Sequence, residues 1–192
     1  MRNILFVLSG PSGVGKGTIA ELIKKRNENV ALSISCTTRR PRDYEKNGVE
    51  YFFITREEFK EKIENGGFLE YSEHFGNLYG TPKDFVKNRL KEKDVLLEID
   101  VNGGLQAKRS FPETVLIFIA PPSVNELKRR LSLRHTETDE QIEKRLERID
   151  YEMEKGESYD YKVVNDDLET AVSEIEKIIE KEKNIFSKGE RI

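Results

Sequence analysis

Three apolar runs recur along the chain, at residues 4–8, 95–99 and 114–119. Strands that are buried on both faces of a parallel sheet have this nearly continuous apolar pattern. Between and after these runs the apolar positions take a helical spacing. Strands that alternate with helices predict an α/β fold, a doubly wound core around a parallel sheet.

Helix starts are marked by capping residues. A hydroxyl side chain followed three positions later by Glu or Gln forms a capping box, and proline is favoured at the first helical position. The expected starts are Thr55 with Glu58, Ser123 with Glu126, Thr138 with Gln141, and Thr81 followed by Pro82.

Two segments interrupt the alternation of strands and helices. Residues 36–89 carry short aromatic strands at 51–54 and 68–71 and many turn residues, which predicts an inserted lobe with its own small sheet. Residues 129–151 read as two charged helical segments with little apolar surface, as expected of a mobile lid. We therefore predict a single domain, 1–192, with a core formed by 1–35 and 90–192.

Charge and composition exclude several classes of protein. The 33 Lys and Arg nearly balance the 36 Asp and Glu, giving a net charge of −3, which argues against a protein that coats nucleic acid. A mean hydropathy of −0.66 and a short first apolar run argue against a membrane protein or an exported one. The single cysteine, Cys36, excludes an intramolecular disulfide and suits the cytoplasm.

A glycine-rich segment follows the first predicted strand and precedes a predicted helix. In this context glycines let backbone N–H groups surround a phosphate, the helix N-terminus adds positive charge, and Lys16 supplies a cation. A plain glycine-rich turn with an exposed lysine is the alternative. Gly17 stands where Ser or Thr would ligate magnesium, a pattern that resembles adenylate kinases and related nucleotide kinases. The expected ATP-binding residues are Gly10, Pro11, Ser12, Gly13, Val14, Gly15, Lys16, Gly17 and Thr18.

A basic segment near residue 40 is the second candidate for anion binding. Arginine side chains bind phosphate oxygens through two parallel hydrogen bonds, and here Arg39, Arg40 and Arg42 lie close to several hydroxyl groups. A solvated basic loop is the alternative.

Taken in order, the motifs resemble the guanylate kinase family. They are TTRRPR at 37–42 with Gly48, Tyr51 and Phe53, then FGNLYGT at 75–81, EID at 98–100, APPS at 120–123 and VNDD at 164–167. The resemblance implies a P-loop three-layer fold with a GMP-binding lobe and a lid. It also implies transfer of the γ-phosphoryl group of ATP to GMP, and we expect dGMP to be an acceptor as well. Mg²⁺ would be carried mainly by the ATP phosphates and water.

Site residues are carried over from this resemblance. The GMP phosphate would meet Ser35, Arg39, Arg42, Tyr51 and Tyr79, and the guanine would meet Glu70, Thr81 and Asp100. Asn165 would lie near the adenine of ATP. Catalytic groups would be Lys16, Arg130, Arg134 and Arg145, and Thr18 and Asp100 are candidates for the outer shell of Mg²⁺.

The chemistry of guanine supports the assignment of Glu70. Guanine presents N1–H and the exocyclic amine side by side, and one carboxylate can accept from both, whereas adenine offers a lone pair there. Alternative interpretations remain for individual residues: Glu70 as an ordinary strand carboxylate, Asp100 as a magnesium-shell carboxylate, and the lid arginines as solvated helix residues. For the whole chain the alternatives are a protein-binding module of this fold, or a kinase of another nucleotide or a phosphorylated sugar.

Overall fold

The computed structural model describes residues 2–74, 76–132 and 148–188. The expected helix start at Thr138 and most of the expected lid lie outside these ranges. Within them, no helix is both long and apolar enough to cross a membrane.

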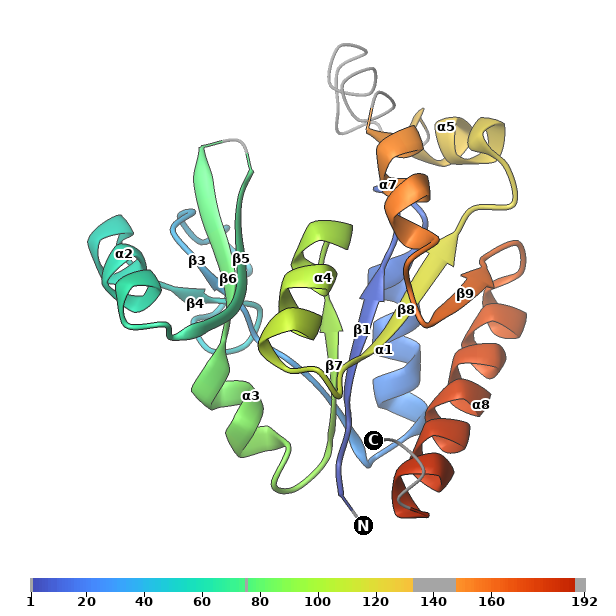
Figure 1. The fold of residues 1–192 in the computed structure, drawn as a ribbon. Helices are drawn as coiled ribbons and strands as arrows, with labels where there is room; N and C mark the ends of the chain where they lie inside the picture. The colour runs from blue at the N-terminus through green and yellow to red at the C-terminus, as the bar shows by residue number, and fades with distance from the viewer. Residues whose placement is uncertain (1, 75, 133–147, 189–192) are drawn as a thin grey trace.

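The larger sheet has five parallel strands in the order β2-β7-β1-β8-β9 (Figure 1). The strands are β1 (Leu5–Ser9), β2 (Val30–Leu32), β7 (Asp94–Glu98), β8 (Val115–Ala120) and β9 (Tyr161–Val164). Every residue of β1 and β8 is buried, as their continuous apolar sequences predict. The strands predicted from the three apolar runs are confirmed, each within one residue at its ends.

Helices cover both faces of this sheet and make the three layers. One face packs against α1 (Lys16–Arg26), α8 (Leu168–Ser187), α5 (Val124–Ser132) and α7 (Ile149–Gly156). The other face packs against α3 (Lys83–Arg89) and α4 (Val101–Ser110). In the three inner strands, β1, β7 and β8, alternate apolar side chains enter one cluster or the other, so Phe6 lies in the first and Val7 in the second.

A second, four-stranded sheet has the order β4-β3-β6-β5 and lies beside α4 (Figure 1). Its strands are β3 (Cys36–Thr37), β4 (Phe52–Phe53), β5 (Phe68–His74) and β6 (Asn77–Pro82), and helix α2 (Arg56–Glu64) lies between β4 and β5 in the sequence. It has its own apolar cluster, which contains Cys36, Phe59, Phe68 and Leu78.

Two of the capping predictions are confirmed and one is wrong. Thr55 and Glu58 form the capping box of α2, and the Ser123 hydroxyl accepts from the backbone N–H of Glu126. Thr81, however, does not start a helix, because it pairs with Glu70 inside the second sheet and α3 begins only at Lys83. The predicted helix is present, but it starts one residue later, with Pro82 rather than Thr81 as its N-cap.

Candidate active site

The glycine-rich segment forms a loop between the central strand β1 and helix α1. Gly10, Gly13 and Gly15 all have positive φ angles. At Gly15 (φ 101°) a Cβ atom would lie 2.7 Å from the amide nitrogen of Asn165, so both conformation and space require glycine. Gly15 is also the N-cap of α1 and caps it with no side-chain hydrogen bond. A helix N-terminus of this kind can donate backbone N–H groups to an anion.

Two side chains hold this loop through its backbone carbonyl groups. Lys16 donates from Nζ to the carbonyl oxygens of Gly10 (2.7 Å) and Pro11 (3.1 Å). Asn165, which is 5% exposed, donates from its amide to the carbonyl oxygen of Val14 at 2.7 Å. Val14 itself is fully buried. The loop is thus anchored in the protein on one side and open to a cavity on the other.

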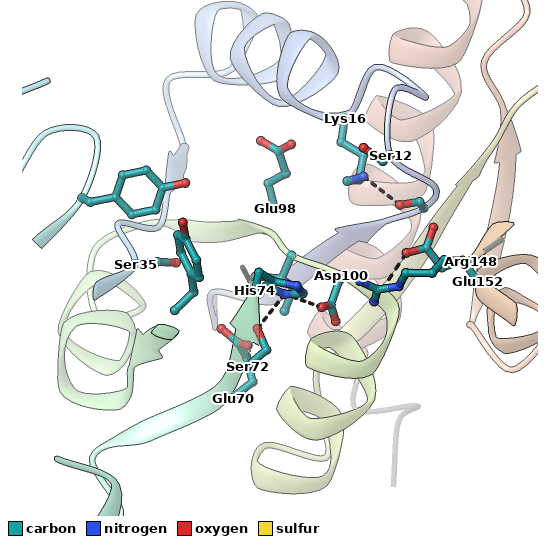
Figure 2. A pocket seen from close by; sticks show the side chains of 14 residues that line it. Ser12, Lys16, Ser35, Glu70, Ser72, His74, Glu98, Asp100, Arg148 and Glu152 are labelled. Atoms are coloured by element: carbon teal, nitrogen blue, oxygen red, sulfur yellow. Dashed lines mark hydrogen bonds and ion pairs between the residues drawn. The ribbon is translucent and has the colours of Figure 1, made fainter. Parts of the chain in front are cut away.

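A cavity of about 570 Å³ joins this loop to the second sheet (Figure 2). It brings together eight of the residues predicted from sequence, which come from five separate parts of the chain: Gly10, Ser12, Lys16, Ser35, Tyr51, Glu70, Tyr79 and Asp100. Arg148, which the family resemblance suggests as an assistant to the lid arginines, also lines it, as do five residues that were not predicted as site residues: Ser72, His74, Glu98, Ile99 and Glu152.

Glu70 is the most deeply buried carboxylate of the cavity, at 5% exposure. The Thr81 hydroxyl donates to its Oε1 at 2.6 Å. Burial raises the pKa of Glu70 to about 7 despite this hydrogen bond, because the charged form loses its water. At position 103 a Cβ atom would come within 2.9 Å of Glu70 Oε2, so Gly103 makes room for this carboxylate.

Asp100 is the N-cap of α4 and lies across the cavity from the phosphate loop. Its Oδ1 accepts from the backbone N–H of Gly103 at 2.8 Å, and its Oδ2 lies 3.0 Å from His74 Nε2. Burial alone would raise the pKa of Asp100, but the hydrogen bonds from His74 and Gly103 outweigh it, and the pKa is lowered. Asp100 is therefore the charged carboxylate at neutral pH, whereas Glu70 titrates close to it.

The arginines of the basic segment do not line the cavity. Arg39 is bound to Glu45 through two hydrogen bonds of 2.8 and 2.9 Å, and its guanidinium lies 5.6 Å from the Tyr51 ring centroid. Arg42 donates to the Tyr44 hydroxyl at 3.1 Å. The structure thus brings Arg39 behind the cavity wall that Tyr51 forms, while Arg42 remains exposed.

The other predicted residues have varied positions. Thr18, in the first turn of α1, lines a separate surface depression with Glu21 and Lys25. Arg130 belongs to α5, but its side chain lies outside the described part of the structure, as do Arg134 and Arg145 entirely.

Glu98 is the unpredicted residue with the clearest signal in the sequence. It is the one charged residue of the apolar run at 95–99, and it ends strand β7. Ligands of open α/β sheets bind at the carboxyl ends of the strands, so this position alone marks it. A Cβ atom at Gly17 would lie 3.3 Å from Glu98 Oε2, which puts this carboxylate beside the phosphate loop. Glu152 and His74 had no comparable signal, since each lies among other polar residues.

A glycine-rich loop after the central strand of a parallel sheet, facing a cavity with buried carboxylates, defines a phosphotransferase of the P-loop class. Comparison with known proteins gives the family. A family model described as guanylate kinase matches residues 2–182. The guanylate kinase of Clostridioides difficile is 48% identical over 192 residues, covering 100% of this chain and 94% of that protein. That of Bacillus subtilis is 51% identical over 180 residues, covering 93% and 88%.

Solved structures agree with the sequences. The guanylate kinase of Anaplasma phagocytophilum has a TM-score of 0.75 at 36% identity, covering 94% of this chain and 86% of that chain. A gluconokinase from Sinorhizobium meliloti, at 15% identity and a TM-score of 0.51, shares the fold alone. The chain therefore belongs to the guanylate kinase family, and it is an enzyme that transfers a phosphoryl group from ATP to GMP. The family resemblance and the α/β fold predicted from sequence are confirmed.

Proposed function

We propose that the cavity binds GMP with its guanine between Glu70 and Asp100 and its phosphate directed toward Ser35, Tyr51 and Tyr79. The phosphates of ATP then occupy the loop at Lys16. The observation that carries this proposal is the buried Glu70 carboxylate, held by the Thr81 hydroxyl at the end of the cavity away from the loop.

Glu70 gives the selectivity for guanine. Its carboxylate accepts from N1–H and from one hydrogen of the exocyclic amine, and Asp100 accepts the second hydrogen of that amine. AMP would place the lone pair of adenine N1 against a carboxylate. Such an unpaired polar contact in a desolvated site gives discrimination of about 10⁴-fold. The 2′-hydroxyl takes no part in these contacts, so dGMP is a substrate as well.

Catalysis requires charge neutralisation rather than a protein base. The phosphate of GMP, with a second pKa near ~6, is already mostly a dianion at neutral pH. Lys16 exchanges its bonds to the carbonyls of Gly10 and Pro11 for the phosphate oxygens of ATP. With the lid arginines Arg130, Arg134 and Arg145, it offsets the repulsion between two polyanions. Arginines in this role contribute about 10³–10⁵ in rate.

We further propose that Mg²⁺ enters with ATP. The donor set at the end of β7 fits a hard cation that keeps several waters, because Glu98 supplies carboxylate oxygens beside the loop at Gly17. Asp100 is assigned to the guanine amine in this proposal and Thr18 lines a separate depression, so we assign Glu98, rather than Asp100 or Thr18, to the water shell of the cation. The cation supplies neutralisation of the phosphate charge when bound.

The proposed compartment is the cytoplasm, where ATP and GMP are available and where the buried free thiol of Cys36 stays reduced. Fractionation of cells that produce the tagged protein tests this location.

Substrate use tests the site. ADP formation from ATP is measured with GMP, dGMP, AMP, UMP, CMP and a set of sugar phosphates, with the Lys16→Met variant as the control for contaminating kinases. We expect GMP and dGMP to be used, and AMP to have a kcat/KM lower by about 10⁴. Equal use of AMP, or preference for a sugar phosphate, would contradict the placement of guanine beside Glu70.

A further inference from the structure

Strand β5 of the second sheet lies along helix α4 and is tied to it at three levels. At one end the Ser110 hydroxyl donates to the carbonyl of Leu69 at 2.9 Å. In the middle, the Gln106 amide exchanges two hydrogen bonds of 3.3 Å with the backbone of Tyr71. At the cavity end, His74 Nε2 lies 3.0 Å from Asp100 Oδ2. This last contact is the only one of the three between side chains that both line the cavity.

His74 and Gly103 together fix the direction of the Asp100 carboxylate. Gly103 N–H holds Oδ1 at 2.8 Å from within α4, and His74 holds Oδ2 from the second sheet (Figure 2). The nitrogen that faces a carboxylate at this distance carries the hydrogen, whether the ring is neutral or charged. Each carboxylate oxygen keeps a further lone pair and so can still accept from a ligand. Asp100 is therefore an oriented acceptor.

The imidazole of His74 also contacts its own sheet. The Ser72 hydroxyl oxygen, two residues earlier on β5, lies 3.0 Å from the same Nε2 and, with the hydrogen on that nitrogen, shares this N–H with Asp100 as a second acceptor (Figure 2). The ring also packs against Tyr79 of β6, with ring centroids 5.9 Å apart. With its side chain 29% exposed, His74 lies at the cavity wall, and its hydrogen-bonding nitrogen is directed toward Asp100.

We infer that His74 is a positioning residue for the recognition of the 2-amino group of the acceptor base. It orients Asp100 so that the free lone pair of this carboxylate meets the second hydrogen of the guanine amine. The contribution of His74 is then selectivity for GMP over IMP, a nucleotide that differs by the absence of that amine. The inference rests on the proposed placement of guanine between Glu70 and Asp100.

Steady-state kinetics with GMP and IMP test the role of His74 on the whole enzyme with MgATP. The His74→Phe variant keeps an aromatic ring and removes the donor, while His74→Gln keeps an N–H group at similar reach. Glu73→Gln, at the adjacent exposed position of β5, is the matched control.

We expect His74→Phe to raise KM for GMP about tenfold, the scale of one hydrogen bond to a charged group, with KM for IMP, KM for ATP and kcat unchanged. His74→Gln should recover most of the loss, and Glu73→Gln should resemble the parent enzyme. An equal rise in KM for GMP and for IMP, or failure of His74→Gln to recover KM for GMP, would show that His74 only joins β5 to α4. Either result would overturn the inference.

Asp100→Asn separates this inference from the proposed function beneath it. Asparagine still caps α4, so the fold is kept, but the charged acceptor is lost. We expect this variant to lose GMP-over-IMP selectivity and to make a further His74→Phe change silent. If Asp100→Asn keeps the selectivity, the placement of guanine fails and the inference with it. If Asp100→Asn loses the selectivity and His74→Phe does not, the inference alone fails.

Discussion

Replacing Glu70 by glutamine should make the enzyme more stable and less active at once. The carboxylate is 5% exposed, and its pKa rises from 4.5 to about 7 because burial penalises the charged form. A shift of roughly 2.5 units corresponds to about 3 kcal/mol. This is the free energy that the folded enzyme without substrate loses by carrying the charge, and glutamine, which is uncharged, removes the loss.

The pH dependence gives the effect its sign. Because the pKa of Glu70 is higher in the folded state than in the unfolded state, the ionised carboxyl destabilises the fold. The penalty is absent well below pH 4.5, grows as the pH rises toward 7 and is nearly complete at pH 8. Glu70→Gln should therefore stabilise by about 3 kcal/mol at pH 8, or about 6–12 °C in Tm, but by less than about 1 kcal/mol at pH 5.

Activity should change in the opposite direction. The amide presents an N–H group to a base edge that itself carries only N–H groups, so kcat/KM for GMP should fall about 10²–10⁴-fold. Thermal unfolding at pH 5 and pH 8 and kinetics with GMP provide the two measurements, with Glu73→Gln, an exposed carboxylate on the same strand, as the control. A variant with parental Tm at both pH values and parental kcat/KM for GMP would refute the reasoning.

Three further changes address the loop, the core and a buried ion pair. Lys16→Met should lower kcat at saturating ATP and GMP about 10²–10³-fold, and a circular dichroism spectrum equal to the parent's should show that the fold is retained. Gly156→Ala should destabilise by about 1–3 kcal/mol in thermal unfolding although alanine favours helices, because its Cβ would lie 2.6 Å from the Phe118 ring; a stabilised variant would contradict this. Lys183→Met should cost about 2–4 kcal/mol in denaturant unfolding, since it removes the cation at 2.7 Å from the fully buried Asp94, whose charge the remaining backbone N–H of Ile4 does not neutralise; adding Asp94→Asn should recover most of the loss.

The sequence is most informative where one local pattern decides the structure. Apolar runs such as 114–119 predict buried strands because a strand covered on both faces is apolar at every position, and the run is too short for a buried helix. The phosphate loop is equally local, since its glycines, its lysine and the start of the following helix lie within nine residues. Thr81 shows the limit, because it pairs with Glu70, eleven residues earlier, and the N-cap of α3 is Pro82 instead.

Charge pairing and cavity walls depend on contacts that the sequence does not display. Arg39 and Arg42 look like a phosphate clamp in the sequence, yet Arg39 is bound to Glu45, six residues on. His74 and Asp100 are 26 positions apart and meet only because β5 lies along α4. The partners of such residues are set by the tertiary arrangement of strands and helices, and residue spacing in the sequence does not predict them.

The second sheet has an apolar cluster of its own, separate from the two clusters that enclose the larger sheet. Of the two carboxylates proposed to bind the base, Glu70 belongs to this smaller sheet, whereas Asp100 and the phosphate loop both follow strands of the larger one. Mutation can therefore explore new acceptor bases without disturbing the packing under the loop. The selectivity for the acceptor base can therefore change during evolution while the phosphate loop that binds ATP stays the same. Engineering of the substrate range should target the cavity walls formed by β5 and β6.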